Sequence, residues 1–183
     1  MARVLVPLAN GCEELEAVTI IDILRRAGVD VVTAGLTDGA ITASRGVVLM
    51  PDKSLDDVLG DDYDMIVLPG GLPGADNLDA DPRIHTLLQR MAEQDRYTAA
   101  ICAAPKVLLN AGLLDGHKVT AYPGVIDGQL GGTSQLLADP VVSDGRVITS
   151  RGPGTAMDFA LTLIVKLLGA DKREEVEAPL VRS

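Results

Sequence analysis

The chain has 183 residues, of which 47% are hydrophobic, so its length and composition predict one globular domain over residues 1–183 and exclude a disordered tail. Its formal net charge of −10 disfavours contact with the phosphates of nucleic acid and with anionic membranes. Three Tyr, one Phe and no Trp leave few rings to stack on bases, so neither nucleic acid nor a membrane is an expected partner.

The apolar segments and the cysteine content predict a cytoplasmic protein. No stretch reaches the roughly 18 uncharged apolar residues that span a bilayer, and the apolar run 4–8 is too short for a signal peptide. Two cysteines do not make a disulfide framework, so both are expected to be thiols in a reducing compartment.

Buried strands and amphipathic helices alternate along the chain. Apolar, β-branched runs predict strands, and apolar residues at helical spacing predict helices between and after them. This alternation predicts βαβ units, and therefore an α/β fold with a mostly parallel sheet and helices on both faces. The predicted strands cover residues 4–8, 29–34, 65–68, 98–101 and 119–121, and the predicted helices cover residues 15–27, 82–94, 106–111, 155–168 and 171–178.

Two pairs of shorter apolar runs have the spacing of β-hairpins. Residues 41–43 precede residues 47–50, and residues 141–143 precede residues 147–149 with an Asp-Gly turn between them. We expect both hairpins to be small additions to the main sheet.

The segments that follow the predicted strands should meet at one edge of the sheet. In open parallel sheets, ligands bind beyond the carboxyl ends of the strands, where the connecting loops vary freely. We therefore expect these segments to line one pocket. They are residues 10–16, 69–71, Cys102, 122–124 and 150–154.

Cys102 has the sequence context of a reactive nucleophile. It lies between a predicted strand and a predicted helix, in the sequence AAICAAP over residues 99–105. Small neighbours permit the strained turn of a nucleophile elbow, and the helix amino terminus is expected to lower the pKa of the thiol. The alternative is an inert, buried thiol, which is the usual state of free cysteine.

Glu13, Glu14 and Glu16 lie at the start of the first predicted helix, where carboxylates complement the helix dipole whatever the function. Glu16 is one turn inside the helix, on an otherwise apolar segment. Burial there would raise its pKa and keep the acid protonated. A protonated carboxyl group can donate a hydrogen bond to a Cys102 thiolate, whereas two adjacent anions would repel each other.

The Gly70-Gly71 pair has two interpretations. It is a common turn sequence, which requires no function. Beside the Cys102 elbow, however, the backbone N–H groups of the pair could join that of Ala103 as an oxyanion hole. Position at the same sheet edge favours the second interpretation.

The two histidines do not suit a Cys-His dyad. His85 lies on the predicted helix 82–94, and His117 precedes a predicted strand, at the opposite edge of the sheet. We expect both at the surface. Because Cys and His residues are not clustered, we expect no metal site.

Cys12 lies in the first loop, at the same predicted edge as Cys102. It could line the pocket, or it could pair with Cys102 as a resolving thiol. A disulfide would need the two Cα atoms within about 7 Å, a distance that sequence does not supply.

Seven stretches make the chain resemble the ThiJ/PfpI superfamily, and within it the branch of the parkinsonism-associated protein DJ-one and the bacterial protein YajL. They extend over essentially the whole chain. These stretches are GCEELE at 11–16, RRAG at 25–28, SRGV at 44–47, VLPGG at 67–71, AAICAAP at 99–105, TSRGPGT at 149–155 and APLV at 178–181.

The resemblance implies a flavodoxin-like, doubly wound fold, a homodimer and no cofactor. It implies that Cys102 is the nucleophile, that Glu16 is its protonated partner, and that Gly71 and Ala103 are the backbone donors. Arg45 matches an arginine near the pocket and the dimer interface. The residues expected to line the binding pocket are Gly70, Arg45, Tyr122, Pro153 and Cys12.

The activity that the resemblance implies is that of a cofactor-free glyoxalase or deglycase. Its substrates would be small 2-oxoaldehydes such as methylglyoxal, or their early protein adducts. Two departures matter: Tyr122 stands where several relatives have histidine, and Ala103 stands where the peptidase branch has histidine, so proteolysis is disfavoured. The alternative is a non-enzymatic redox sensor or oxidative-stress chaperone that acts through oxidation of Cys102.

Overall fold

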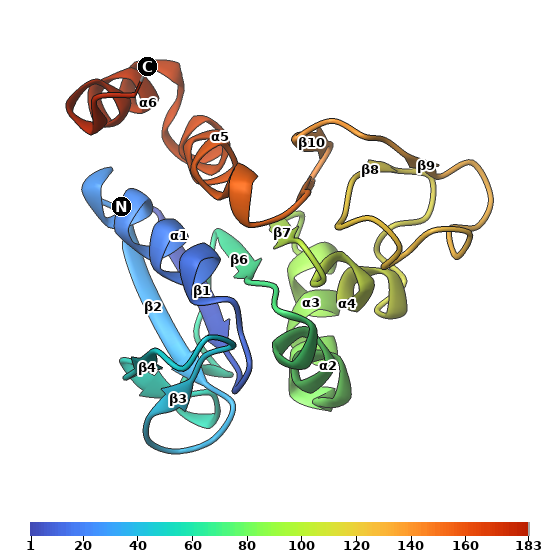
Figure 1. Cartoon of the computed structure of the whole chain (residues 1–183), viewed down its shortest axis with the longest axis horizontal. Coiled ribbons are helices and arrows are strands. Elements are labelled where there is room, and N and C mark those ends of the chain that lie inside the picture. Colours follow the sequence, from blue (N-terminus) through green and yellow to red (C-terminus); the bar gives the residue numbers. More distant parts are fainter. Residues whose placement is uncertain (183) are drawn as a thin grey trace.

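One central sheet organises the chain, for which the computed structural model describes residues 1–182 (Figure 1). Its strands are β1 (Arg3–Leu8), β2 (Asp30–Gly35), β5 (Lys53–Ser54), β6 (Met65–Leu68), β7 (Tyr97–Ile101), β10 (Val141–Asp144) and β11 (Val147–Ser150). The strand order is β10-β11-β7-β6-β1-β2-β5. The edge strand β10 pairs antiparallel with β11, and the other pairings of this sheet are parallel.

Alternate side chains of the strands supply two separate hydrophobic cores. Val4 and Val6 of β1 face one core and Leu5 faces the other, because successive side chains of a strand point to opposite faces. Each fully buried side chain of this size contributes roughly 1.5–3 kcal/mol of transfer free energy. Because both faces of the sheet are buried, the central strands show no polar alternation.

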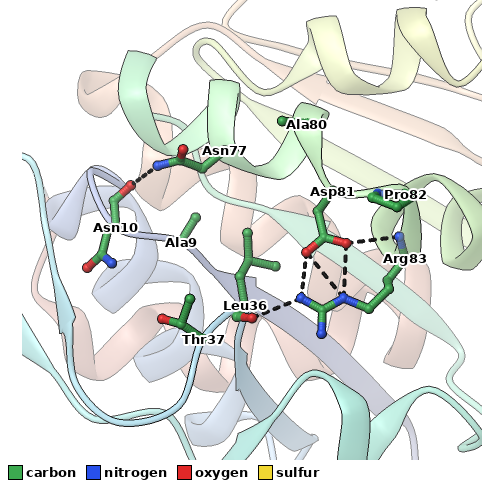
Figure 2. A pocket seen from close by; sticks show the side chains of 9 residues that line it. All are labelled: Ala9, Asn10, Leu36, Thr37, Asn77, Ala80, Asp81, Pro82 and Arg83. Atoms are coloured by element: carbon green, nitrogen blue, oxygen red, sulfur yellow. Dashed lines mark hydrogen bonds and ion pairs between the residues drawn. The ribbon is translucent and has the colours of Figure 1, made fainter.

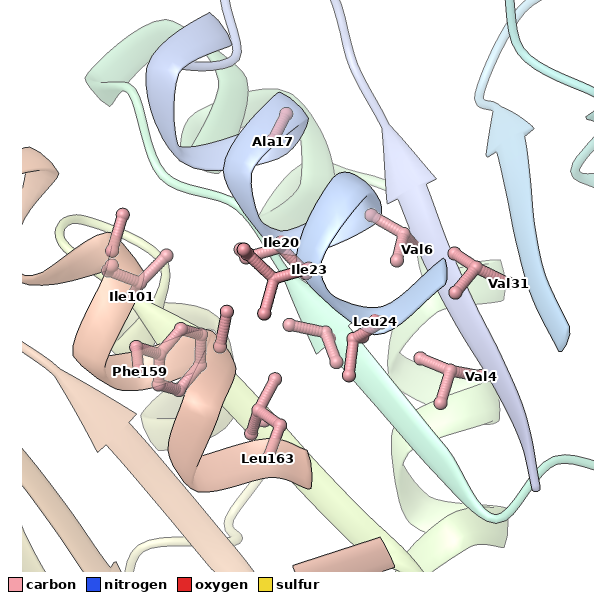
Figure 3. Close-up of a cluster of buried hydrophobic side chains, with 14 of the residues drawn as sticks. Val4, Val6, Ala17, Ile20, Ile23, Leu24, Val31, Ile101, Phe159 and Leu163 are labelled. Atoms are coloured by element: carbon pink, nitrogen blue, oxygen red, sulfur yellow. The ribbon is translucent and has the colours of Figure 1, made fainter. Parts of the chain in front are cut away.

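Helices cover both faces of the sheet. On one face lie α1 (Glu14–Arg26) and α5 (Ala156–Leu168), where Phe159 of α5 packs near Ile20 and Ile23 of α1 (Figure 3). On the other face lie α3 (Pro82–Glu93) and α4 (Pro105–Asn110), with α2 (Leu72–Ala80) packed against both. The last helix, α6 (Ala170–Glu177), packs on α5. This arrangement confirms the flavodoxin-like, doubly wound α/β fold.

The strand order places one crevice at the centre of the sheet. The chain leaves β1 toward β2 on one side and returns to β6 on the other, so the direction of winding reverses between β1 and β6. Ligands of open α/β sheets bind at such a reversal, because the loops diverge there. The loops after β1, β6 and β7 meet at this point.

The predicted strand 119–121 is not part of the main sheet. Its counterpart β8 (Lys118–Val119) pairs with β9 (Gln135–Leu136) in a separate two-stranded sheet. The position beside β7 is taken by β11, whose four residues are all buried. Thr120 instead donates its N–H to Thr149 Oγ1 at 2.8 Å, so the segment is tied to β11 through a side chain.

The first predicted hairpin also lies outside the main sheet, whereas the second is confirmed at its edge as β10 and β11. The first forms β3 (Ile41–Thr42) and β4 (Val48–Leu49). Its backbone pairs with the loop after β1, through Gly11 N–H to Thr42 O and Ser44 N–H to Cys12 O, both at 2.8 Å. These bonds hold it over the loop rather than along a strand edge.

The predicted helices agree with the observed helices to about one residue at each end, but α2, β5 and β9 were not predicted. The sequence PGGLPG at the start of α2 is typical of turns. Strand β5 has two residues, too few to show a period. No helix within residues 1–182 is long and apolar enough to cross a membrane.

Candidate active site

Cys102 lies at a strained turn between β7 and α4. Its φ is +63°, in the left-handed region that residues other than glycine rarely adopt. The backbone is held on both sides, because Cys102 N–H donates to Ser150 O at 3.0 Å and Cys102 O accepts from Tyr122 N–H at 2.9 Å. This is the geometry that the predicted nucleophile elbow requires.

Glu16 is brought against the elbow by Gly70. The carboxyl group is fully buried, and its Oε2 accepts a hydrogen bond from Gly70 N–H at 2.8 Å. A Cβ atom at Gly70 would lie 2.6 Å from Cys102 Cβ and 2.7 Å from Glu16 Oε2. Only a glycine leaves room for the two functional side chains to meet there.

The second carboxyl oxygen of Glu16 has no nitrogen or oxygen partner. Oε1 is buried, and no such group within residues 1–182 donates to it. A buried carboxylate oxygen without a donor is costly, whereas a protonated carboxyl group can donate its own O–H. Burial accordingly raises the pKa of Glu16 from its usual value of 4.5 to about 7.

The pKa of Cys102 differs from the sequence-based expectation. The helix amino terminus was expected to lower it, but burial and the neighbouring charge of Glu16 raise it to about 12. The side chain is 9% exposed, and α4 has only six residues, so its dipole is small. The thiol and the carboxyl group therefore titrate as one coupled pair that retains a proton above pH 7.

Backbone N–H groups of Gly71 and Ala103 converge on the Cys102 sulfur. Hydrogen bonds from both lower the pKa of the thiol, in opposition to burial. Gly71 adopts a φ of +83°, and a Cβ atom there would lie 2.4 Å from Gly11 O. The close packing of the loops after β1 and β6 thus requires glycine and aims these donors at the sulfur.

A cavity of about 540 Å³ opens above the sulfur. Arg45, Tyr122 and Pro153 line it, as expected, together with Cys102, Gly71 and Ala103. Gly70 lies beneath Cys102 rather than in the wall. Glu13, Pro123 and Gly124 also line the cavity and belong to the segments expected there, whereas Leu72, Lys106 and Val125 lie outside those segments.

Comparison with known proteins decides the family. The profile of the DJ-1/PfpI family matches residues 2–166 of this chain. The chain belongs to the DJ-1/PfpI family.

Individual members of the family are similar over nearly their whole length. The Danio rerio Parkinson disease protein 7 homolog is 43% identical over 182 residues, covering 98% of this chain and 96% of that protein. The Caenorhabditis elegans glutathione-independent glyoxalase DJR-1.2 is 37% identical, covering 98% and 95%. The structure of oxidized Toxoplasma gondii DJ-1 matches with a TM-score of 0.95 at 39% identity, covering all of both chains.

Cys12 does not line the cavity, contrary to expectation. Its side chain is 1% exposed within the core beneath α1 and α5, and both cysteines are free thiols. Burial and the charge of Glu14 raise the pKa of Cys12 to about 11. In this DJ-1/PfpI protein, the Cys12 side chain is therefore a packing residue. The Cys12 carbonyl oxygen accepts a hydrogen bond from Ser44 N–H.

Glu14 positions the loop that carries Arg45, a role that the sequence did not reveal. Its carboxylate accepts hydrogen bonds from Arg45 N–H at 2.8 Å and from Ser44 Oγ at 2.9 Å. Burial opposes ionisation, but these bonds and one from Val47 N–H outweigh it and lower the pKa of Glu14 below its usual value. Nothing local distinguishes Glu14 from its acidic neighbours.

Neither histidine takes part in the site. His85 Nε2 lies 3.2 Å from Asp79 Oδ1, and His117 Nδ1 lies 3.6 Å from Asp144 Oδ2. Neither residue lines the cavity above Cys102. Within residues 1–182, no cluster of three or more His, Cys, Asp or Glu side chains could hold a metal ion.

A second cavity, of about 520 Å³, lies beyond the ends of β1 and β2 (Figure 2). Its most polar side chains are engaged with their neighbours. Arg83 pairs with Asp81 at 2.6 Å and donates to Leu36 O at 2.9 Å, while Asn77 donates to Asn10 O at 2.9 Å. These contacts hold the α2–α3 corner to the loops after β1 and β2, so the arrangement serves stability.

The buried Glu16 predicts an unusual dependence of stability on pH. The pKa of Glu16 is raised in the folded state. Its contribution to the free energy of unfolding is therefore fully present below pH 4.5 and is lost as the pH rises through about 7. Between pH 5 and pH 8 the free energy of unfolding should fall by roughly 2–3 kcal/mol for this reason. Glu16→Gln should remove that loss, so urea unfolding should show the variant gaining stability relative to the wild type at pH 8. Parallel pH profiles would contradict the assignment.

Proposed function

We propose that this protein is a cofactor-free, cysteine-dependent glyoxalase that converts methylglyoxal-type 2-oxoaldehydes into 2-hydroxy acids. The observation that carries the proposal is a strained Cys102 that lines an open cavity and is hydrogen-bonded to the fully buried Glu16. The name of the Caenorhabditis elegans relative supports it. Early protein adducts of these aldehydes are a second proposed substrate.

The proposed reaction begins when the Cys102 thiol passes its proton to the Glu16 carboxylate and the sulfur adds to the aldehyde carbon. Glu16 gives its proton to the resulting oxyanion, which the N–H groups of Gly71 and Ala103 stabilise, and a hemithioacetal forms. The Glu16 carboxylate then moves a proton from the former aldehyde carbon to the neighbouring carbonyl carbon, while the hydroxyl proton of the hemithioacetal passes to the carbonyl oxygen, which produces the thioester of a 2-hydroxy acid. Water hydrolyses the thioester to the 2-hydroxy acid and frees the thiol, so the net change is addition of one water molecule.

The pKa of Glu16 suits this double role. A general acid and base works best when its pKa is near the working pH, and burial raises the pKa of Glu16 to about 7. Because the pair keeps one shared proton, the Glu16 carboxylate and the Cys102 thiolate are not both negatively charged at the same time. Proteolysis is not proposed, because no histidine lines the described cavity.

The test is production of lactate from methylglyoxal in glutathione-free buffer, with the two lactate enantiomers measured separately. We expect steady turnover by the untreated protein and none after alkylation of Cys102 with iodoacetamide. Absence of turnover by the untreated protein would refute the enzymatic proposal. A reducing compartment such as the cytoplasm is part of the proposal, because the thiol must be free.

A redox sensor or chaperone that responds to Cys102 oxidation is the second candidate. It is favoured by the Toxoplasma gondii relative, whose structure is described as oxidized. The N–H groups of Gly71 and Ala103 could hold the oxygens of a Cys102 sulfinate. Peroxide should then add two oxygen atoms to the Cys102 peptide in mass spectrometry, and the absence of this product would refute the candidate.

We also propose that the protein is a homodimer through the outer face of α1 and strand β4. Leu15, Val18, Val48 and Met50 are large apolar side chains that are about half exposed or more, and Val18 and Met50 line one shallow depression. Such patches mark interfaces, and a second copy offers the same apolar face. Light scattering should give twice the chain mass, and Val48→Asp should give monomers whereas the exposed Val181→Asp should not.

A further inference from the structure

Lys106 is a charged residue in the wall of the active-site cavity, and the proposed reaction does not use it. It lies in the first turn of α4, four residues after Cys102, and lines the same cavity. Its side chain is 19% exposed, and its ammonium group pairs with Asp76 of α2. The Asp76 side chain is 57% exposed, so water screens its charge more than that of Lys106.

Arg45 supplies a second cation to the same cavity. No carboxylate within residues 1–182 forms an ion pair with it, although the loop that carries it is fixed by Glu14. Glu13 is the carboxylate among the described lining residues, and it accepts a hydrogen bond from Ser44 Oγ at 2.9 Å. Two cations therefore line the cavity that contains the reactive sulfur.

This local charge opposes that of the whole chain, which has 26 acidic and 16 basic residues. An anion approaching at random is repelled, whereas one inside the cavity meets the largely buried Lys106 side chain in a medium of lower dielectric than water. A neutral aldehyde gains nothing from either cation. The charge pattern thus distinguishes substrates by a group remote from the reacting carbon.

We propose that Lys106, assisted by Arg45, selects 2-oxoaldehydes that carry a carboxylate or phosphate group. The ammonium group holds the anionic end while the aldehyde carbon lies at the Cys102 sulfur. The inference rests on the proposed glyoxalase function and names its substrate class. With 4,5-dioxopentanoate as the probe, addition of one water molecule gives 2-hydroxyglutarate, and the remote carboxylate is unchanged.

Alkylation of Cys102 tests the charge selection without any turnover. The measured quantity is the ratio of the alkylation rates with iodoacetate, an anion, and iodoacetamide, which is neutral. Lys106→Gln should lower this ratio about fivefold, and Asp76→Asn should raise it, because the ammonium group loses its competing carboxylate. Lys53→Gln is the matched control, since it removes the same charge from the exposed residue Lys53 on β5.

Turnover then tests the substrate class. The ratio of kcat/KM for 4,5-dioxopentanoate to that for methylglyoxal should fall roughly tenfold in Lys106→Gln and should stay at the wild-type value in Lys53→Gln. Unchanged ratios in Lys106→Gln, for both alkylation and turnover, would overturn the inference. If the wild type converts neither aldehyde, the glyoxalase proposal fails, whereas the alkylation ratios still decide whether Lys106 selects anions.

Discussion

Cys102→Ser is expected to abolish conversion of methylglyoxal to lactate, with kcat/KM at least about 1,000-fold below the wild type. A serine hydroxyl is a far weaker nucleophile than a thiol, and here neither histidine is placed to activate it. The buried, raised-pKa Glu16 is tuned to exchange a proton with sulfur rather than to deprotonate an alcohol. Initial rates at pH 7.5 over a range of methylglyoxal concentrations would measure the loss.

Cys12→Ser is the control for this experiment, because Cys12 lies in the core and does not line the cavity. It should retain turnover close to that of the wild type, with at most a modest loss of thermal stability from burying a hydroxyl group. Substantial turnover by Cys102→Ser would show that the reaction occurs elsewhere. Loss of activity in Cys12→Ser with an intact fold would restore the alternative of a functional cysteine pair.

Gly70→Ala is expected to damage both stability and catalysis. Its Cβ would lie 2.6 Å from Cys102 Cβ and 2.8 Å from Ile101 O, and neither atom can move without displacing the elbow. Overpacking of this kind costs about 3 kcal/mol, which for a chain of this length lowers Tm by roughly 6–12 °C. Displacing the sulfur from Glu16 should also reduce kcat by about 100-fold. Calorimetry and turnover at 20 °C would separate the two effects.

Gly60→Ala provides the matched glycine control. No heavy atom lies within 4 Å of a Cβ atom built at Gly60, and the residue is exposed in a turn. Tm and turnover should therefore stay close to the wild-type values. If Gly70→Ala behaved in the same way, the close contact of Gly70 with Cys102 and Glu16 would be wrong.

The nucleophile elbow is the part of the site that local sequence predicts best. A strand, a single reactive residue, small neighbours and a proline together specify a backbone turn over seven residues, and Cys102 adopts it. Glu16 could be proposed because a carboxylate on an apolar stretch of helix must be buried. Lys106 gave no such signal, since a lysine in the first turn of an amphipathic helix is ordinarily solvated.

The position of residues 119–121 illustrates where sequence reasoning about the fold fails. The run is apolar and β-branched, as a central strand would be, yet β11 lies beside β7 and the run lies outside the main sheet. Both segments satisfy the local pattern of a buried strand. Which one pairs with β7 depends on how the β10–β11 hairpin, α4 and α5 pack together, and that information is not local.

The amino-acid sequence by itself therefore determined the alternation of strands and helices, the sheet edge at which the loops meet, and the elbow at Cys102, because periodicity and turn chemistry act over a few residues. The tertiary structure alone decided that Cys12 is buried, that Lys106 lines the cavity of Cys102, and that the pKa of Cys102 is raised instead of lowered. These properties depend on burial and on charges from segments far apart in the chain. Only the packed fold brings those segments together.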